Sequence, residues 1–150
     1  MGDSYSSCFI HYVFSTKERR PLIIPELRDQ LWSYMGGIAR LNKMIPVIIG
    51  GDVDHSHTVI KLPTTLTIAK GIQVIKAGSS KWVHETYPAM ANFAWQVGYG
   101  AFSISSMNLP SAIAYVRQQE EHHKKISFKD EYLGILKKHG VAIDERYIWD

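Results

Sequence analysis

The sequence predicts an α+β fold of the ferredoxin-like class, an antiparallel βαββαβ sheet with additional C-terminal helices. Two observations lead to this prediction. Segments rich in β-branched and aromatic residues alternate with amphipathic stretches in the order strand, helix, strand, strand, helix, strand. A glycine-rich turn at residues 50–54 joins the two middle strands as a hairpin. The 150 residues and the 45% hydrophobic content suit a single domain spanning residues 1–150.

The first half of the chain is predicted to contain three strands and one helix. Residues 7–15 are aromatic and β-branched, which is typical of a strand. Pro25 suits the first turn of a helix, whose apolar stripe continues to Leu41. Residues 44–49 are predicted to form a buried strand. The next strand begins at His55 and ends before Pro63.

The second half is predicted to contain one more strand and three helices. Thr65 or Thr67 can cap a helix that stops at residues 78–80, and residues 81–97 are expected to be irregular. A strand follows at residues 99–106, with Phe102 on one face and a small, polar face that we expect to be free of helix. Helices are then expected over residues 111–123 and from Ser127, in capping-box style, to Gly140.

Two histidines one residue apart stand at the start of the third strand. Alternate side chains of a strand point to the same face, so His55 and His57 project side by side, while Ser56 faces the core. Two parallel imidazoles on a strand can chelate a divalent metal ion. The pair alone is a weak signal, because half-exposed strand histidines are common. We expect the histidine face to be uncovered by helix.

Composition narrows the possible settings of the chain. No apolar run approaches the roughly 20 residues of a membrane span, and the N-terminus lacks a signal-peptide pattern. Cys8 is the only cysteine, which favours a reducing, cytoplasmic location. The net charge of +3 permits a nucleic-acid partner without requiring one. No membrane association is expected.

Two further segments could carry function. Tyr115 and Gln119 are four residues apart on the predicted helix 111–123, so they lie on one face. Lys17, Arg19 and Arg20 form a basic loop after the first strand. Such a loop is either a solvated turn or a contact for the phosphates of a nucleic acid.

The paired motifs, His55-x-His57 on a central strand and Tyr115-x-x-x-Gln119 on a helix after the last strand, resemble the HUH superfamily. More narrowly, the chain is similar to the single-tyrosine transposases of insertion sequences and their relatives associated with repetitive extragenic palindromes. The segments 93–105 and 115–123 are also similar to that family. Ser56 departs from the family pattern, in which a bulky hydrophobic residue separates the histidines. Because Ser56 faces the core, we expect it to affect packing more than chemistry.

The resemblance implies a metal-dependent DNA transposase, an endonuclease and strand transferase acting on single-stranded DNA that carries hairpin ends. Mg²⁺ or Mn²⁺ would be held by His55, His57 and Gln119 and would act as a Lewis acid. Tyr115 would attack the scissile phosphate, form a 5′-phosphotyrosine and release a 3′-hydroxyl. The basic loop residues and Arg117 are expected to contact the DNA.

The resemblance also implies a homodimer whose active sites are shared between chains. The tyrosine helix and the last helix appear in the sequence after both sheet-covering helices, so we expect no packing surface for them on their own sheet. Exchange of the tyrosine helix between two chains would solve this problem. Tyr115 of one chain would then face His55 and His57 of its partner.

Two alternatives remain open at this point. One is a non-catalytic protein that binds single-stranded nucleic acid on an RRM-like sheet, which would need exposed aromatics such as Phe9 or Tyr12. The other is a metal-dependent hydrolase that uses activated water. It would need acidic ligands beside the histidines, and Asp52 and Asp54 are near in sequence but belong to the predicted turn.

Overall fold

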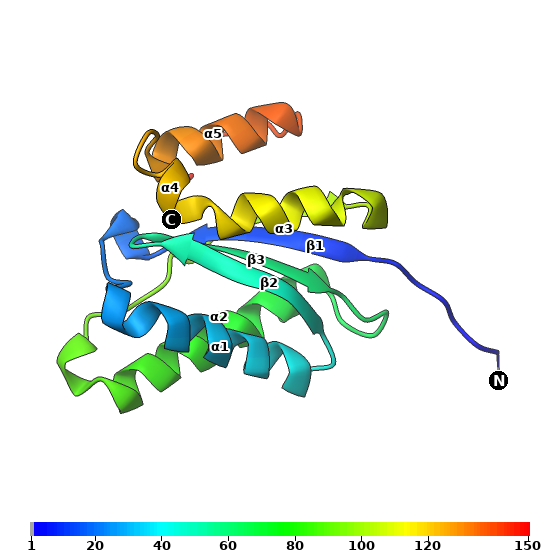
Figure 1. The fold of residues 1–150 in the computed structure, drawn as a ribbon, viewed down its shortest axis with the longest axis horizontal. Helices are drawn as coiled ribbons and strands as arrows, with labels where there is room; N and C mark the ends of the chain where they lie inside the picture. The colour runs from blue at the N-terminus through cyan, green and yellow to red at the C-terminus, as the bar shows by residue number, and fades with distance from the viewer. Residues whose placement is uncertain (1) are drawn as a thin grey trace.

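The computed structural model describes residues 2–150 and confirms the predicted fold class (Figure 1). A four-stranded antiparallel sheet has the order β2-β3-β1-β4. Its strands are β1 (Phe9–Ser15), β2 (Ile45–Asp52), β3 (His55–Lys61) and β4 (Gly100–Ile104). The α-helices are α1 (Pro25–Leu41), α2 (Ile68–Thr86), α3 (Leu109–Arg117), α4 (Gln119–His122) and α5 (Phe128–Lys138). Three short 3₁₀ turns are η1 (Lys17–Arg19), η2 (Pro88–Met90) and η3 (Ser106–Asn108).

Helices α1 and α2 cover one face of the sheet and form the main core with it (Figure 1). Tyr12 and Phe14 point from β1 into this core, as Ile60 does from β3. Thr67 caps α2, accepting a hydrogen bond from the backbone N–H of Lys70 at 3.0 Å. Strand β3 pairs with β2 on one side and β1 on the other, so the histidine strand lies inside the sheet rather than at its edge.

Helix α2 continues to Thr86, so the predictions of a stop at residues 78–80 and of an irregular segment from residue 81 are wrong. Gly78 and Ser79 are small because α2 packs closely against its neighbours at this point. A Cβ added at Gly78 would lie 2.8 Å from Ile38 Cδ1 on α1, so a side chain there would force the helices apart. Ser79 is buried and its Oγ accepts a hydrogen bond from Trp95 Nε1 at 2.9 Å. Gly78 thus allows α1 and α2 to approach, and Ser79 links α2 to Trp95.

The prediction that the histidine face is uncovered is also wrong. Helices α3, α4 and α5 lie on the side of the sheet opposite α1 and α2 (Figure 1). Phe102 and Val13 belong to this face and form a second core with side chains of α5 and the C-terminal residues. Alternation along β4 was predicted correctly, but its large side chain Phe102 faces the histidine side, and Ala101 faces the main core. Large apolar side chains on both faces require helices on both faces.

The predicted helix 111–123 is broken at Gln118, whose φ of −96° and ψ of 12° separate α3 from α4. Helix α3 packs against β2 of its own sheet. The expectation that the tyrosine helix has no packing surface on its own sheet is therefore wrong. The C-terminal aromatic Trp149 packs against Phe128 and Tyr132 of α5. None of the helices between residues 2 and 150 has the length and apolar character that a membrane crossing needs.

Candidate active site

The two histidines of β3 form the floor of a buried polar cluster. His55 and His57 are both 0% exposed. The Nδ1 of His55 donates to the carboxylate of Asp54 at 2.8 Å, and its Nε2 lies 2.8 Å from Gln119 Oε1. The Nδ1 of His57 lies 2.7 Å from Nε2 of His11 on β1. Each ring therefore has a partner behind it that fixes its orientation, as ligand histidines do in metal sites.

Ser56 points to the opposite face of β3, as predicted. Its hydroxyl lies 2.9 Å from that of Thr58, and both residues are buried. The two hydroxyls satisfy each other inside the main core. This pairing replaces apolar packing at a position that does not contact the histidine cluster.

Helices α3 and α4 bring the predicted tyrosine and glutamine to the histidines. The Tyr115 ring centroid lies 5.5 Å from that of His57. Gln119 is buried at the start of α4 and contacts His55 as described above. The structure thus brings together all four side chains that the sequence analysis singled out for catalysis and metal binding, within one chain.

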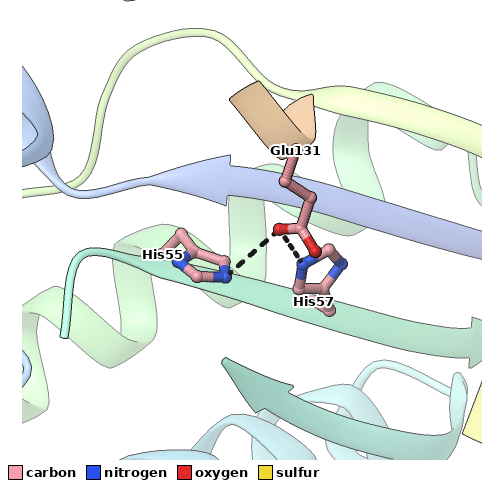
Figure 2. Close-up of side chains that lie close together, drawn as sticks. All are labelled: His55, His57 and Glu131. Atoms are coloured by element: carbon pink, nitrogen blue, oxygen red, sulfur yellow. Dashed lines mark hydrogen bonds and ion pairs between the residues drawn. The ribbon is translucent and has the colours of Figure 1, made fainter. Parts of the chain in front are cut away.

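A carboxylate that the sequence analysis missed lies at the centre of the cluster. Glu131 of α5 reaches down to the histidine pair (Figure 2). Its Oε1 lies 3.0 Å from His57 Nε2 and 3.6 Å from His55 Nε2. Its Oε2 accepts hydrogen bonds from the Tyr115 hydroxyl and, at 3.0 Å, from Gln119 Nε2. Glu131 therefore contacts every one of the four predicted residues.

Two histidines of the following segment surround the same carboxylate. His123 Nε2 lies 3.1 Å from Glu131 Oε1 and 2.9 Å from Gln119 Oε1. His122 Nε2 lies 3.3 Å from Glu131 Oε2. From the sequence, His122 was expected on the same helix face as Tyr115 and Gln119, as one candidate base for the tyrosine, and His123 was given no role. The available signal was the pair of adjacent histidines at the end of the predicted helix, because helix formation does not require them.

Charge in the cluster is set by competition between burial and pairing. Burial opposes ionisation of Glu131, but hydrogen bonds from His123 and His57 outweigh it and hold the pKa of the carboxyl well below its usual range. Burial lowers the pKa of His57 to about 4, and burial with His57 nearby lowers that of His11 to about 3. Burial and the Glu131 charge both raise the pKa of Tyr115. The same carboxylate outweighs the burial of His123 and raises the pKa of that imidazole. The cluster therefore holds a buried carboxylate beside His123, neutral imidazoles at His11 and His57, and a protonated tyrosine.

A cavity of about 390 Å³ adjoins the cluster on its open side. Tyr115, Glu131 and His11 line its inner end. Lys138 and His139 of α5 line it as well, and Lys138 is exposed. Tyr115 therefore lies between the cluster and a space that a ligand could enter.

The predicted basic loop lies at the same end of the sheet as His55. The backbone N–H of Thr16 donates to the carbonyl of Asp54 at 2.9 Å. Within the loop, Lys17 and Arg20 are exposed, while the Arg19 guanidinium lies over the Trp149 ring, 4.3 Å from its centroid. Arg117 is exposed at the end of α3. Three of these residues thus follow the strand end beside Asp54, and Arg117 ends the helix that carries Tyr115.

Comparisons with known proteins agree with this arrangement. The sequence matches the family described as IS200-like transposases over residues 4–119. The fold is similar to that of a candidate transposase from Deinococcus radiodurans R1, with a TM-score of 0.63, 19% identity, and coverage of 79% of this chain and 96% of that chain. It is also similar to a REP-associated tyrosine transposase bound to a REP hairpin, with a TM-score of 0.60, 14% identity, and coverage of 84% and 76%. No curated protein sequence matches the chain.

The fold and the family match define a transposase of the single-tyrosine type, a class of DNA-cleaving enzymes. The chain belongs to the family of IS200-like transposases, which confirms the resemblance found in the sequence. The family match ends at Gln119, so α5 and Glu131 lie outside it.

Proposed function

We propose that this chain is a metal-dependent transposase that cuts and rejoins single-stranded DNA through a phosphotyrosine intermediate. The observation that supports this most directly is the approach of Tyr115 to the paired histidines of β3, over a ring-centroid distance of 5.5 Å to His57. The family match adds independent support, because it covers both motifs.

The chemistry is a bond exchange at phosphorus. The phenolic oxygen of Tyr115 forms a bond to the phosphorus of the scissile phosphate, and the bond from phosphorus to the 3′ oxygen breaks. The phosphate keeps its bond to the 5′ oxygen, so the product is a 5′-phosphotyrosine. The 3′ oxygen leaves with a proton, and the tyrosine proton is lost to its surroundings. One phosphodiester replaces another, so a 3′-hydroxyl can later reverse the reaction and rejoin the strand.

The donor set of the cluster fits a divalent cation. His55 and His57 present imidazole nitrogens, and Gln119 presents an amide oxygen beside them. We propose that these residues hold Mg²⁺ or Mn²⁺, which would neutralise the charge that develops on the phosphate. His11 and Asp54 would keep the two imidazoles oriented from behind.

Single-stranded DNA with hairpin ends is the proposed substrate. The REP-associated neighbour is bound to a REP hairpin, which supports hairpin DNA as a ligand for this fold. We propose that the exposed side chains of Lys17, Arg20 and Arg117 contact the phosphates, and that Arg19 does so after leaving Trp149. The cytoplasmic location stays a prediction.

The homodimer with shared active sites also stays a prediction, and we propose it in the form of a helix exchange. An exchanged element makes the same contacts between chains that it makes within one chain. The packing of α3 on β2 is therefore compatible with contacts inside one chain and with contacts between two exchanged chains. The hinge would be η3, where Met107 is 88% exposed.

The non-catalytic alternative finds less support in the structure. Tyr12 is 0% exposed in the main core, so it offers no surface for stacking bases. The hydrolase alternative gains one observation, because Glu131 places a carboxylate beside the histidine pair. Attack by tyrosine gives a covalent protein–DNA adduct, whereas hydrolysis by water does not.

The proposed function is tested by that adduct. The protein is incubated with Mn²⁺ and 5′-tailed single-stranded hairpin DNA, then denatured and separated by electrophoresis. We expect a protein–DNA species whose tryptic peptide carries a nucleotide on Tyr115 by mass spectrometry. Fully duplex DNA of the same sequence is the control. Cleaved DNA without any covalent species would favour hydrolysis and contradict the proposal.

The packing of α3 on β2 gives a second prediction. Gly50 faces His57 across the β2–β3 ladder, and a Cβ added there would lie 2.8 Å from Val116 Cγ1 and 3.2 Å from the Val116 carbonyl oxygen. Gly50→Ala should therefore shift α3 and move Tyr115. Since a misplacement of about 1 Å can cost roughly a hundredfold in rate, we expect DNA cleavage to fall by about that factor.

Gly37→Ala in α1 is the matched control, because an added Cβ there meets nothing within 4 Å. Cleavage rates are compared on the same DNA after both variants are shown to fold. Equal rates in the two variants would mean that this contact does not place the tyrosine.

A further inference from the structure

We infer that Glu131 is itself a ligand of the divalent cation, so that this chain binds metal through His55, His57 and a carboxylate from α5. This inference rests on the proposed function and deepens it, because it concerns the same site. It changes the ligand set from two imidazoles and an amide to one that includes a negative charge.

The distances between the donor atoms fit a common cation. Neighbouring ligands of an octahedral ion with bonds of about 2.1 Å lie about 3.0 Å apart. Glu131 Oε1 lies 3.0 Å from His57 Nε2 and 3.6 Å from His55 Nε2, and the three donor atoms all lie within 4.8 Å of one another. Small adjustments of the Glu131 side chain would bring the set to bonding distance.

The hydrogen bonds behind the histidines leave lone pairs facing this point. Because His55 donates its Nδ1 proton in a hydrogen bond to Asp54, the tautomer with Nδ1–H alone directs its Nε2 lone pair at Gln119 Oε1, 2.8 Å away. Glu131 Oε1 approaches the same nitrogen. These acceptors face a common point that a cation would occupy well. His123 Nε2, which lies 2.9 Å from Gln119 Oε1 and 3.1 Å from Glu131 Oε1, can bridge the two oxygens when no cation is bound.

His57 can present its lone pair in the same way. Its Nδ1 lies 2.7 Å from His11 Nε2, so a proton on Nδ1 can be donated to His11. In this tautomer Nε2 of His57 no longer donates to Glu131 and is free to bind a cation together with it. The contact with His11 thus supports the tautomer of His57 that metal binding needs.

The carboxylate also suits the cation better than the amide does. Mg²⁺ and Mn²⁺ prefer oxygen ligands, and carboxylates in particular. Glu131 is 5% exposed, and a buried carboxylate is stabilised by positive charge placed beside it. A divalent cation would supply that charge. Glu131 lies beyond residues 4–119, the segment that matches the family.

The inference is tested by titration of Mn²⁺ alone into the full chain, with free Mn²⁺ measured by electron paramagnetic resonance. We expect Glu131→Gln and His57→Ala each to weaken Mn²⁺ binding by at least about tenfold. Glu131→Asp keeps the charge and should lose less. Glu145→Gln, at an exposed position, is the matched control and should bind as the wild type does.

The outcomes separate this inference from the proposed function. Mn²⁺ binding that is lost in His57→Ala but unchanged in Glu131→Gln overturns the role of Glu131 and leaves the histidine site intact. A Tyr115 adduct formed without any Mn²⁺ binding would instead contradict the metal part of the proposed function.

A second measurement needs no substitution. In wild-type protein labelled with ¹³C at glutamate carboxyls, the diamagnetic ion Mg²⁺ should shift the Glu131 signal and leave that of Glu145 unchanged. An unshifted Glu131 signal at saturating Mg²⁺ overturns the inference, even where the Glu131 variants fold poorly.

Discussion

Replacing Tyr115 with phenylalanine should abolish the covalent protein–DNA adduct and strand cleavage, while DNA binding and folding survive. The substitution removes a single oxygen, the proposed nucleophile. It also removes one hydrogen bond to Glu131, which keeps its contacts with His57, His123 and Gln119. We therefore expect a loss of stability of about 1 kcal/mol. The measurements are adduct yield on denaturing gels, binding by fluorescence anisotropy and thermal unfolding.

Tyr147→Phe is the matched control, because Tyr147 is exposed and outside the cluster. It should form the adduct at the wild-type rate. A Tyr115→Phe protein that still forms an adduct would show that another residue is the nucleophile, and the assignment would fail.

Mixing two inactive variants should restore cleavage if the active sites are shared by helix exchange. Tyr115→Phe chains keep the histidines, and His57→Ala chains keep the tyrosine. A heterodimer with exchanged α3 helices contains one site with both wild-type residues, so about half of the sites in each heterodimer should work. The measurement is adduct formation after the two proteins are mixed under conditions that allow subunit exchange.

Heterodimer formation is checked by mass photometry with one chain fused to a larger tag. Heterodimers that bind DNA and remain inactive would show that each site is built within one chain, as the contacts of Tyr115 with His57 allow. Two copies of either variant alone are the controls and should stay inactive.

The part of this site that could be predicted from the sequence depends on local geometry. Strand alternation places His55 and His57 on one face whatever packs on that face. The spacing of Tyr115 and Gln119 puts them on one side of a helix, and both reach the cluster although the helix breaks at Gln118. Periodicity fixed these relations because each involves neighbours in the chain.

Glu131 could not be found in this way, because its role depends on which face of the sheet α5 covers. Periodicity gives the two faces of a strand but does not say which helix covers them. One signal was present: Phe102 and Val13 make the histidine face apolar beyond the histidines, so it needed a cover. Glu131 lies within the apolar stripe of α5, three residues after Phe128 and one before Tyr132, where a charged side chain would not be expected unless it has partners.

The position of α5 makes access to the histidines a local opening reaction. His55 and His57 are fully covered, with the Phe128 ring stacked on His55 at a centroid distance of 4.1 Å, so a phosphodiester reaches them only after α5 moves. The free energy of that opening enters every measured DNA affinity, since the apparent dissociation constant is the intrinsic one divided by the open fraction. Substitutions between α5 and the sheet would therefore tune DNA affinity without touching DNA.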